Sequence, residues 1–256
     1  MIQEQAPIIS NTEVMPGTHL MWVRTGMASS ARPGQFAMLG CDDGNLRLLR
    51  RPVSIHAVKS GMAAFLFAVV GAGTEWLAQR QPGKSLDLTG PFGKGFSIEA
   101  KSHKLLLIAG GMGIAPFTFL AEDGLNKGLN VRILAGARTA TQICPTSLIP
   151  ASCEFITATE DGTAGEKGLV TALLPRHVDW ADQIFICGPL PMFKAIASNC
   201  EPVLKGKSVQ VSLEVRMGCG MGFCYACTIR TKLGLKQVCK DGPVFPLNDV
   251  IWDELK

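Results

Sequence analysis

Four cysteines near the C-terminal end of this 256-residue chain follow the order C-x4-C-x2-C-x11-C. The first three lie in a glycine-rich stretch, Gly218 to Ala226, and glycine alone enters left-handed backbone conformations without steric cost. Each iron of a sulfide-bridged pair takes two thiolates, and the loop around it must fold tightly back on itself. The spacing therefore predicts a [2Fe–2S] cluster with four ligands: Cys219, Cys224, Cys227 and Cys239.

Two other uses of these cysteines compete with a cluster. Four thiolates also satisfy tetrahedral Zn²⁺, but structural zinc sites usually come as two short pairs, not as three close ligands and one distant return. A disulfide framework does not suit an odd count of nine cysteines, and five of them follow no pattern: Cys41, Cys144, Cys153, Cys187 and Cys200. No signal peptide is recognisable at the N-terminus, so we expect a reduced, cytoplasmic protein.

Composition limits the other classes of function. An apolar share of 47% with 18% charged residues describes a globular protein with large cores. The net charge of +4 is spread along the chain without a lysine or arginine cluster, which argues against nucleic acid as a partner. The longest apolar stretch, Leu105 to Ala121, contains three glycines and a proline and is too short to span a membrane. We expect neither nucleic-acid binding nor a membrane span.

The hydrophobic pattern changes twice along the chain. Residues 1–99 contain short apolar runs between turn signals, which is typical of a closed antiparallel barrel. We expect strands at His19–Thr25, Gln35–Cys41, Val53–Val58, Ala63–Val70 and Ser85–Thr89.

Residues 100–213 alternate buried strands with helices, which predicts a doubly wound parallel sheet. Residues 214–256 have little periodicity and are too few to build a core alone, so a cluster and the neighbouring domains must hold them. The predicted fold is therefore mixed β and α/β, with a small C-terminal cluster segment. The expected strands of the sheet are Leu105–Ala109, Val131–Ala135, Glu154–Ala158, Ile184–Cys187 and Val209–Leu213, and the expected helices are Ala115–Lys127 and Leu190–Leu204.

Glycines follow the first parallel strand where a helix is expected to begin: Gly110, Gly111 and Gly113. Backbone N–H groups at such a turn can meet a pyrophosphate, and the missing side chains let it approach. The turn does not match the G-x-G-x-x-G fingerprint, and tight glycine turns are often purely structural. A nucleotide site and a structural turn both remain open here.

Two carboxylates, Glu160 and Asp161, follow the third parallel strand. A carboxylate at this place can accept hydrogen bonds from the adenosine ribose and would repel a 2′-phosphate. The pair predicts a preference for NAD(H) over NADP(H), with a solvated acidic turn as the alternative.

Motifs in all three parts resemble one superfamily. Arg51-Pro52-Val53-Ser54 resembles the Arg-x-x-Ser/Thr flavin motif of the ferredoxin–NADP⁺ reductases, and Cys187-Gly188-Pro189 with Met192 resembles their nicotinamide-side motif. The run from Cys219 to Phe245 is similar to the cluster segment of the electron-transfer subunits of type B dihydroorotate dehydrogenases. The resemblance covers nearly the whole chain in order.

The resemblance implies three cofactors: FAD on the barrel, NAD(H) on the parallel sheet and the [2Fe–2S] cluster. It implies an electron relay to or from an FMN-containing dihydroorotate dehydrogenase catalytic subunit in pyrimidine (UMP) biosynthesis, in a heterotetramer with two copies of each subunit. Cys187 would lie nearest the nicotinamide, where a catalytic role and a small buried side chain are both open, and Gly188 and Pro189 would complete that site. The implied FAD residues are Arg51, Pro52, Val53, Ser54, Leu66, Phe67, Ala68, Gly73 and Thr74.

The chain departs from the family pattern in two places. Phe67-Ala68 stands where many members carry Tyr-Arg, which removes a phenol and a cation from the implied flavin pocket. Val215 stands where a second glutamate is common, and we expect little consequence for the cluster because its four cysteine ligands remain intact.

Two rival functions stay open. A related subunit could exchange electrons between NAD(P)H and ferredoxin or serve a sulfur-reducing complex. A non-catalytic module could instead use the cluster to sense redox state.

Overall fold

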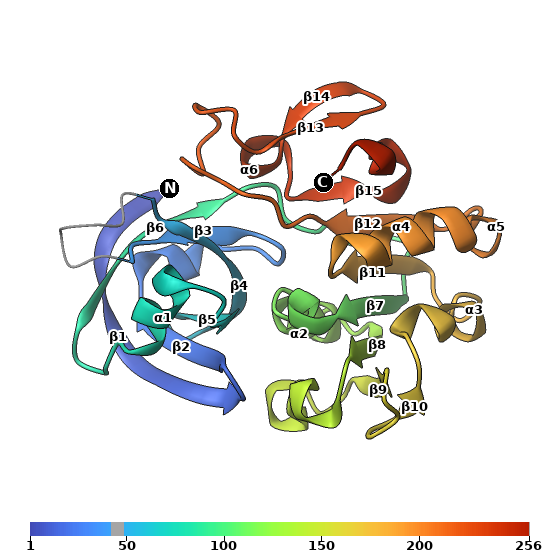
Figure 1. Ribbon diagram of the computed structural model, residues 1–256, viewed down its shortest axis with the longest axis horizontal. Helices are drawn as coiled ribbons and strands as arrows, with labels where there is room; N and C mark the ends of the chain where they lie inside the picture. Colours follow the sequence, from blue (N-terminus) through green and yellow to red (C-terminus); the bar gives the residue numbers. More distant parts are fainter. Residues whose placement is uncertain (42–48, 256) are drawn as a thin grey trace.

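The computed structural model describes residues 1–41 and 49–255. Figure 1 shows an N-terminal barrel (blue to teal) beside a sheet flanked by helices (green to orange), with a C-terminal segment (red) along the top of both. The mixed β and α/β architecture predicted from the pattern is confirmed. Within the described ranges, no helix is long and apolar enough to cross a membrane.

Antiparallel strands close into the barrel in the order β1-β2-β5-β4-β3-β6. Alternate side chains, such as Ile55 on β4 and Phe65 on β5, fill its interior because successive residues of a strand face opposite sides. The elements are β1 (Ile2–Met15), β2 (Thr18–Arg24), the 3₁₀ helix η1 (Gly26–Ser29), β3 (Phe36–Leu39), β4 (Arg51–Lys59), β5 (Met62–Ala68), α1 (Ala72–Ala78) and β6 (Ser85–Phe92).

The long strand β1 is missing from the predicted set. Its outward positions carry polar residues such as Gln3 and Glu13, and Pro7 interrupts the run, so no apolar alternation marks it. Its first half is defined by a partner far along the chain, because residues 2–7 pair with β6, while residues 8–15 pair with the adjacent strand β2. The long-range pairing with β6 leaves no local signal in residues 2–7.

The second part is a sheet in the order β10-β9-β8-β7-β11-β12-β15, parallel as far as β12. Its central strand, β7, is buried on both faces: Leu106 and Ile108 face one core, while Leu105 and Leu107 face the other. The elements are β7 (Lys104–Gly110), η2 (Gly111–Ile114), α2 (Phe117–Asn126), β8 (Asn130–Ala137), η3 (Ala140–Gln142), η4 (Thr146–Leu148), β9 (Glu154–Thr159), β10 (Glu166–Lys167), η5 (Val170–Ala172), α3 (Leu174–His177), β11 (Gln183–Cys187), α4 (Leu190–Asn199), α5 (Glu201–Leu204) and β12 (Ser208–Ser212).

The helices differ from the predicted spans at their ends. The first begins at Phe117 instead of Ala115, because the 3₁₀ helix η2 occupies the residues directly after β7. The second ends at Asn199, and α5 follows as a separate turn. Pro202 explains the break, because proline lacks the N–H that a continuous helix requires.

The C-terminal segment is joined to the parallel sheet. Its strand β15 pairs antiparallel with β12, with Phe245 opposite Val211, and so extends the sheet at that edge. The expectation that this segment needs its neighbours is therefore met by a shared sheet as well as by side-chain packing. Its elements are β13 (Thr228–Thr231), β14 (Gly234–Gln237), α6 (Val238–Asp241), β15 (Val244–Pro246), η6 (Leu247–Asp249) and η7 (Trp252–Glu254).

One hydrophobic core unites all three parts. Met38 and Phe92 of the barrel, Leu213 after β12, and Cys227 and Cys239 of the C-terminal segment are buried in the same cluster. Burial of apolar surface contributes about 25 cal/mol per Å², so this shared core stabilises a segment that could not fold alone. The cysteine segment thus takes its position from both neighbours.

The connection between barrel and sheet is held by a buried amide. Gln183, at the start of β11, is fully buried. Its Oε1 accepts hydrogen bonds from Glu99 N (3.0 Å) and Ser102 Oγ (3.3 Å), and its Nε2 donates to Ser97 O (2.8 Å). Gln210 on β12 also bonds Ser97, but those bonds are exposed. The linker is therefore fixed mainly by Gln183.

Replacing Gln183 by methionine should lower the free energy of unfolding by about 2 kcal/mol, because the linker N–H and C=O groups lose their partners. The matched change Gln210→Met should cost less than about 1 kcal/mol, because water can replace its exposed hydrogen bonds. Urea denaturation of the two variants measures the difference. Equal losses would contradict the assigned role of Gln183.

Candidate functional site

The first part of the site is the cysteine loop that follows β12. Gly220 (φ 72°), Gly222 (φ 86°) and Tyr225 (φ 59°) adopt left-handed backbone conformations, which turn the loop back on itself. The turned loop directs N–H groups at sulfur: Cys219 Sγ accepts from Met221 N at 3.4 Å and from Phe223 N at 3.3 Å. This is the donor arrangement that an iron–sulfur centre requires.

The four thiols form two pairs. The free thiols of Cys219 and Cys224 share a hydrogen bond. The thiols of Cys227 and Cys239 share another, and Cys239 N also donates to Cys227 Sγ at 3.4 Å. Zinc would need four ligands around one point, whereas each iron of a [2Fe–2S] cluster takes two thiolates. The arrangement fits the binuclear cluster.

The two pairs differ in electrostatics. Burial alone would raise the pKa of Cys219, but N–H donation from Met221, Cys224 and Phe223 outweighs it and lowers that pKa to about 6. Burial, the adjacent Cys227 thiol and the charge of Cys219 raise the pKa of Cys239 to about 12. Cys219 is therefore disposed to be a thiolate before any metal arrives.

The loop has an inner and an outer side. On the inner side, a Cβ added to Gly220 would lie 2.6 Å from Met38 Cγ, so the loop rests directly on barrel strand β3. On the outer side Cys224 is exposed. Beside it, Met221, Phe223 and Tyr225 expose 41%, 78% and 69% of their surface. We call these four residues the cluster-loop patch.

The predicted flavin residues come together between β4 and α1. A Cβ on Gly73 would lie 2.6 Å from Arg51 Nε, so the guanidinium occupies the space that only a glycine leaves. Arg51 Nη1 also donates to Leu49 O at 2.6 Å. The Thr74 hydroxyl accepts from Val70 N (2.9 Å) and donates to Gly71 O (3.0 Å). A guanidinium held at a backbone turn suits a diphosphate.

The remaining flavin candidates divide between two faces of the barrel wall. Val53 and Phe67 point into the barrel core, where the Phe67 ring stacks on His19 with 5.8 Å between ring centroids. Leu66 points the other way and packs with residues of the parallel sheet and of α2. Pro52, Ser54 and Ala68 alternate with the inward residues and are half-buried. Ser54, Leu66 and Ala68 thus belong to the wall outside the barrel core.

The glycine turn and the Cys187-Gly188-Pro189 motif lie against each other at the carboxyl ends of β7 and β11. A Cβ on Gly113 would lie 2.0 Å from Cys187 O, and one on Gly110 would lie 2.8 Å from Pro189 Cδ. Gly111 (φ 52°) is different, because its Cβ would meet no atom within 4 Å. Two glycines therefore allow close packing within the protein, and the third leaves open space for a ligand.

Cys187 lies in this motif but is not accessible. It is 1% exposed, and its thiol interacts with the Ser212 hydroxyl of the adjacent strand β12. Burial first, and the nearby Glu214 carboxylate second, raise the pKa of Cys187 well above the ordinary thiol value. A neutral, buried thiol can shape a nicotinamide pocket but is not a nucleophile. Sequence spacing could not reveal Ser212 as its neighbour, because strand order is a tertiary property.

The two predicted ribose carboxylates behave differently. The Asp161 carboxylate accepts from Thr163 N (3.0 Å) and Thr163 Oγ1 (2.7 Å), and these hydrogen bonds lower the pKa of Asp161. Asp161 therefore caps its own turn. Glu160 is exposed at the end of β9, the same sheet edge that carries the glycine turn. Of the two, Glu160 is the better placed for a ribose.

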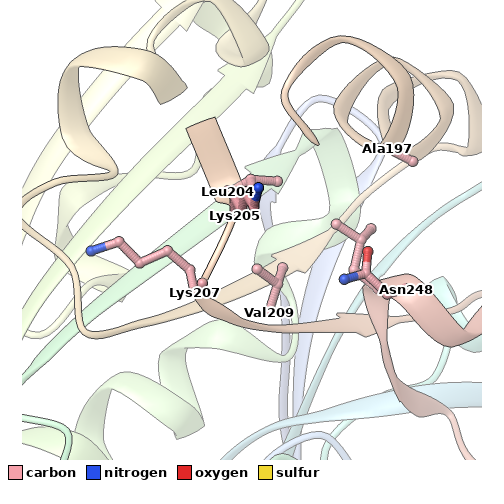
Figure 2. A pocket seen from close by; sticks show the side chains of 8 residues that line it. Ala197, Leu204, Lys205, Lys207, Val209 and Asn248 are labelled. Carbon is pink, nitrogen blue, oxygen red and sulfur yellow. The ribbon is translucent and has the colours of Figure 1, made fainter. Parts of the chain in front are cut away.

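A hollow of about 130 Å³ lies elsewhere, between α4, α5, β12 and η6 (Figure 2). These elements carry none of the predicted site residues. Figure 2 shows Lys207 extending away from the other labelled side chains, and its Nζ donates to Ala181 O at 2.7 Å. The hollow thus contributes nothing to the site described above.

Comparisons with known proteins agree with this geometry. Residues 214–251 match the family described as the iron-sulfur cluster binding domain of dihydroorotate dehydrogenase B. A chain from the structure of the NADH-dependent reduced ferredoxin-NADP oxidoreductase superposes with a TM-score of 0.88 at 28% identity, covering 98% of this chain and 91% of that chain. A ferredoxin NADP⁺ reductase from Neisseria gonorrhoeae, solved with FAD and NADP, shares the fold with a TM-score of 0.63 at 19% identity, covering 75% of this chain and 87% of that chain.

Two relatives in sequence extend over almost the whole chain. Both are named dihydroorotate dehydrogenase B (NAD(+)), electron transfer subunit. The protein from Desulforamulus reducens is 39% identical and the one from Geobacillus thermodenitrificans is 34% identical, each covering 97% of this chain and 98% of the relative. These matches confirm the resemblance seen in the motifs: the chain belongs to the family of dihydroorotate dehydrogenase B electron transfer subunits.

Proposed function

We propose that this protein relays electrons between NAD(H) and an FMN-containing dihydroorotate dehydrogenase catalytic subunit in UMP biosynthesis. Bound FAD would exchange a hydride with the nicotinamide and single electrons with the [2Fe–2S] cluster, which no side chain of the protein can do. The observation that carries the proposal is the arrangement of four thiols as two pairs: Cys219 and Cys224 lie on a loop that rests on the barrel, and Cys227 pairs with Cys239 of α6.

The chain's own task at the cluster is to hold thiolates and supply N–H donors. Cys219 and Cys224 would bind one iron, and Cys227 and Cys239 the other. Support comes from the donors that lower the pKa of Cys219, since they favour the ligating thiolate before metal binds. Cys227 and Cys239 are buried, whereas Cys219 is partly exposed and Cys224 exposed. A cluster held by both pairs would therefore lie between the protein core and the solvent.

For FAD, Arg51 would neutralise the diphosphate, and Gly73 and Thr74 would form the turn beside it. The half-buried residues Ser54 and Ala68 would line the flavin from the outer barrel wall. Val53 and Phe67 would hold that wall from inside, and Leu66 would hold it against the parallel sheet. This division is supported by the direction of the side chains, which lie on opposite faces of the barrel wall. Pro52 would fix the backbone conformation at the start of β4, because the proline ring restricts the angle φ.

For NAD(H), the turn at Gly110, Gly111 and Gly113 would receive the pyrophosphate, and Cys187, Gly188 and Pro189 would form the nicotinamide side. Contact between these two motifs supports a single nucleotide site. Glu160 would bind the ribose hydroxyls and repel a 2′-phosphate, with Asp161 holding the turn. This assignment favours NAD(H) over NADP(H).

The catalytic partner would dock on the cluster-loop patch. Support comes from the exposure of Phe223 and Tyr225 directly beside Cys224, because aromatic residues are enriched in the cores of protein interfaces. We propose two copies of each subunit, a cytoplasmic location and three domains over residues 1–99, 100–213 and 214–256, with β15 of the last domain completing the sheet of the second.

A second candidate is exchange of electrons between NAD(P)H and ferredoxin. The favouring observation is the match to the NADH-dependent reduced ferredoxin-NADP oxidoreductase structure over 98% of this chain. Native purification distinguishes the two, because an FMN-containing dihydroorotate dehydrogenase should accompany the chain only under the first proposal.

In cluster-free protein, iodoacetamide at pH 7 should modify Cys219 much faster than Cys239. The thiolate is the reactive form, and a pKa of about 6 leaves Cys219 mostly ionised at pH 7, whereas a pKa of about 12 keeps Cys239 protonated. Lowering the pH to 5 should slow the reaction at Cys219 about tenfold. Peptide mapping by mass spectrometry measures both sites, and equal rates would contradict the proposed electrostatics.

Replacing Cys224 by serine should abolish the visible absorbance of the cluster while NADH still bleaches the flavin. The change removes one iron ligand but touches neither Arg51 nor the glycine turn. The control is Cys153→Ser, which alters a half-buried thiol outside the loop and should keep both signals. A cluster that NADH never reduces in the unaltered protein would favour a redox-sensing module instead.

Replacing Arg51 by alanine should reduce bound FAD at least about tenfold without loss of iron, because a charge-assisted contact to the diphosphate disappears. The matched control is Arg50→Ala, since Arg50 is paired with Asp87 at 2.5 Å and lies next in sequence. Flavin and iron are counted on the same sample. Full flavin occupancy in the Arg51 variant would refute the flavin site.

A further inference from the structure

A buried histidine connects the barrel to the nucleotide side of the parallel sheet. His56 lies on β4, is 2% exposed, and its Nδ1 is 2.8 Å from the carbonyl oxygen of Ala115. Ala115 is itself buried and directly follows η2, which contains Gly111 and Gly113 of the glycine turn. A single side chain thus reaches from the barrel to the end of that turn.

The direction of this hydrogen bond follows from its chemistry. A carbonyl oxygen can only accept, so Nδ1 must carry the hydrogen. Burial lowers the pKa of His56 to about 4, with the Ala115 contact opposing the shift, so the ring is neutral near pH 7. The ring is therefore held in one tautomer as a donor of one hydrogen bond.

His56 shares its strand face with the proposed flavin residues. Ser54 and Pro52 precede it by two and four positions, on the outer face of β4. The register with β5 shifts between Ile55 and Ala57, and the contact with Ala115 shows that His56 also points out of the barrel. α2 packs on β4 at this face. The contact at His56 therefore links the strand that would carry the flavin to the turn that would carry the nicotinamide nucleotide.

A second polar connection between the two parts, through the linker, acts at the opposite edge of the sheet. Gln183 makes hydrogen bonds to the linker at the amino end of β11, whereas the glycine turn lies at the carboxyl end of the neighbouring strand β7. Attachment at the linker edge alone would leave a hinge, because the far edge could still tilt. Apolar contacts such as those of Leu66 keep the surfaces together but do not define a direction.

We propose that His56 is a positioning residue whose Nδ1–H, by holding the Ala115 carbonyl, sets the distance between the flavin strand and the nucleotide turn. This inference rests on the proposed function, since it concerns transfer between two cofactors that the chain must align. Misplacement by about 1 Å can cost about 10²-fold in rate, so one directional contact is sufficient to matter.

Three variants separate the hydrogen bond from packing. His56→Asn keeps an amide N–H at the same number of bonds from the backbone as Nδ1, whereas His56→Gln moves the amide one bond further. His56→Leu keeps apolar bulk without a donor, and it decides the question if the glutamine variant does not fold. The full chain, loaded with FAD and iron, is used throughout.

Two measurements are made on each variant. Stopped-flow bleaching of the flavin by NADH should slow about tenfold in His56→Gln and His56→Leu and stay within about twofold in His56→Asn. Hydrogen–deuterium exchange without nucleotide should rise about tenfold for the amides of residues 111–117 in the same two variants and stay unchanged in His56→Asn. Reduction of the flavin by dithionite is the control and should not change.

Unchanged bleaching and exchange in the glutamine and leucine variants would overturn the proposal, as would an asparagine variant as slow as they are. Failure of the proposed function looks different, because NADH would then leave the flavin of the unaltered protein oxidised. The exchange measurement still tests the contact between His56 and the turn in that case.

Discussion

The rest of the structure depends on how a segment too small for its own core is attached to two larger parts. Strand β15 extends the parallel sheet through β12, and the buried thiols Cys227 and Cys239 share a core with Met38 of the barrel. Because backbone pairing and apolar burial both act on this segment, the cysteine loop has a fixed place above β3. A loop attached only by its chain ends would have no defined orientation toward a flavin.

The parallel sheet imposes a second constraint. Its parallel strands all end at one edge, which brings together the turn after β7, the motif after β11 and the acidic turn after β9. Close packing at this edge requires the absence of side chains, as the position of Gly113 against the Cys187 carbonyl shows. The same packing buries the Cys187 thiol, which is 1% exposed and therefore not accessible to a reactant in solvent.

A relay of carriers requires three parts at fixed separations, and the barrel accordingly has several attachments. Gln183 holds the linker, His56 reaches the glycine turn, and Lys94 N donates to Gly242 O of the C-terminal segment at 2.5 Å. The contacts come from elements far apart in sequence. Together they resist movement in more than one direction, which no single contact could do.

What the sequence determined by itself is the local chemistry. Cysteine spacing, the glycines after a buried strand and the Arg-x-x-Ser motif are short patterns, and each acts through residues that are neighbours along the chain. Buried runs such as Leu105–Ala109 also mark their own strands, because a strand covered on both faces must be apolar throughout. Those features predicted the fold class and the candidate residues, and the family comparisons agree with them.

Only the tertiary structure decided which of these residues meet. The pairing of Cys219 with Cys224 and of Cys227 with Cys239, the barrel strand β1, the use of Asp161 in its own turn and the reach of His56 to Ala115 all depend on contacts between distant segments or on the exact path of a turn. The pattern of residue types along the chain predicts which residues are buried and which local backbone conformation they prefer. The pattern does not predict which distant segment each residue contacts, because those contacts are set by the packing of the whole chain.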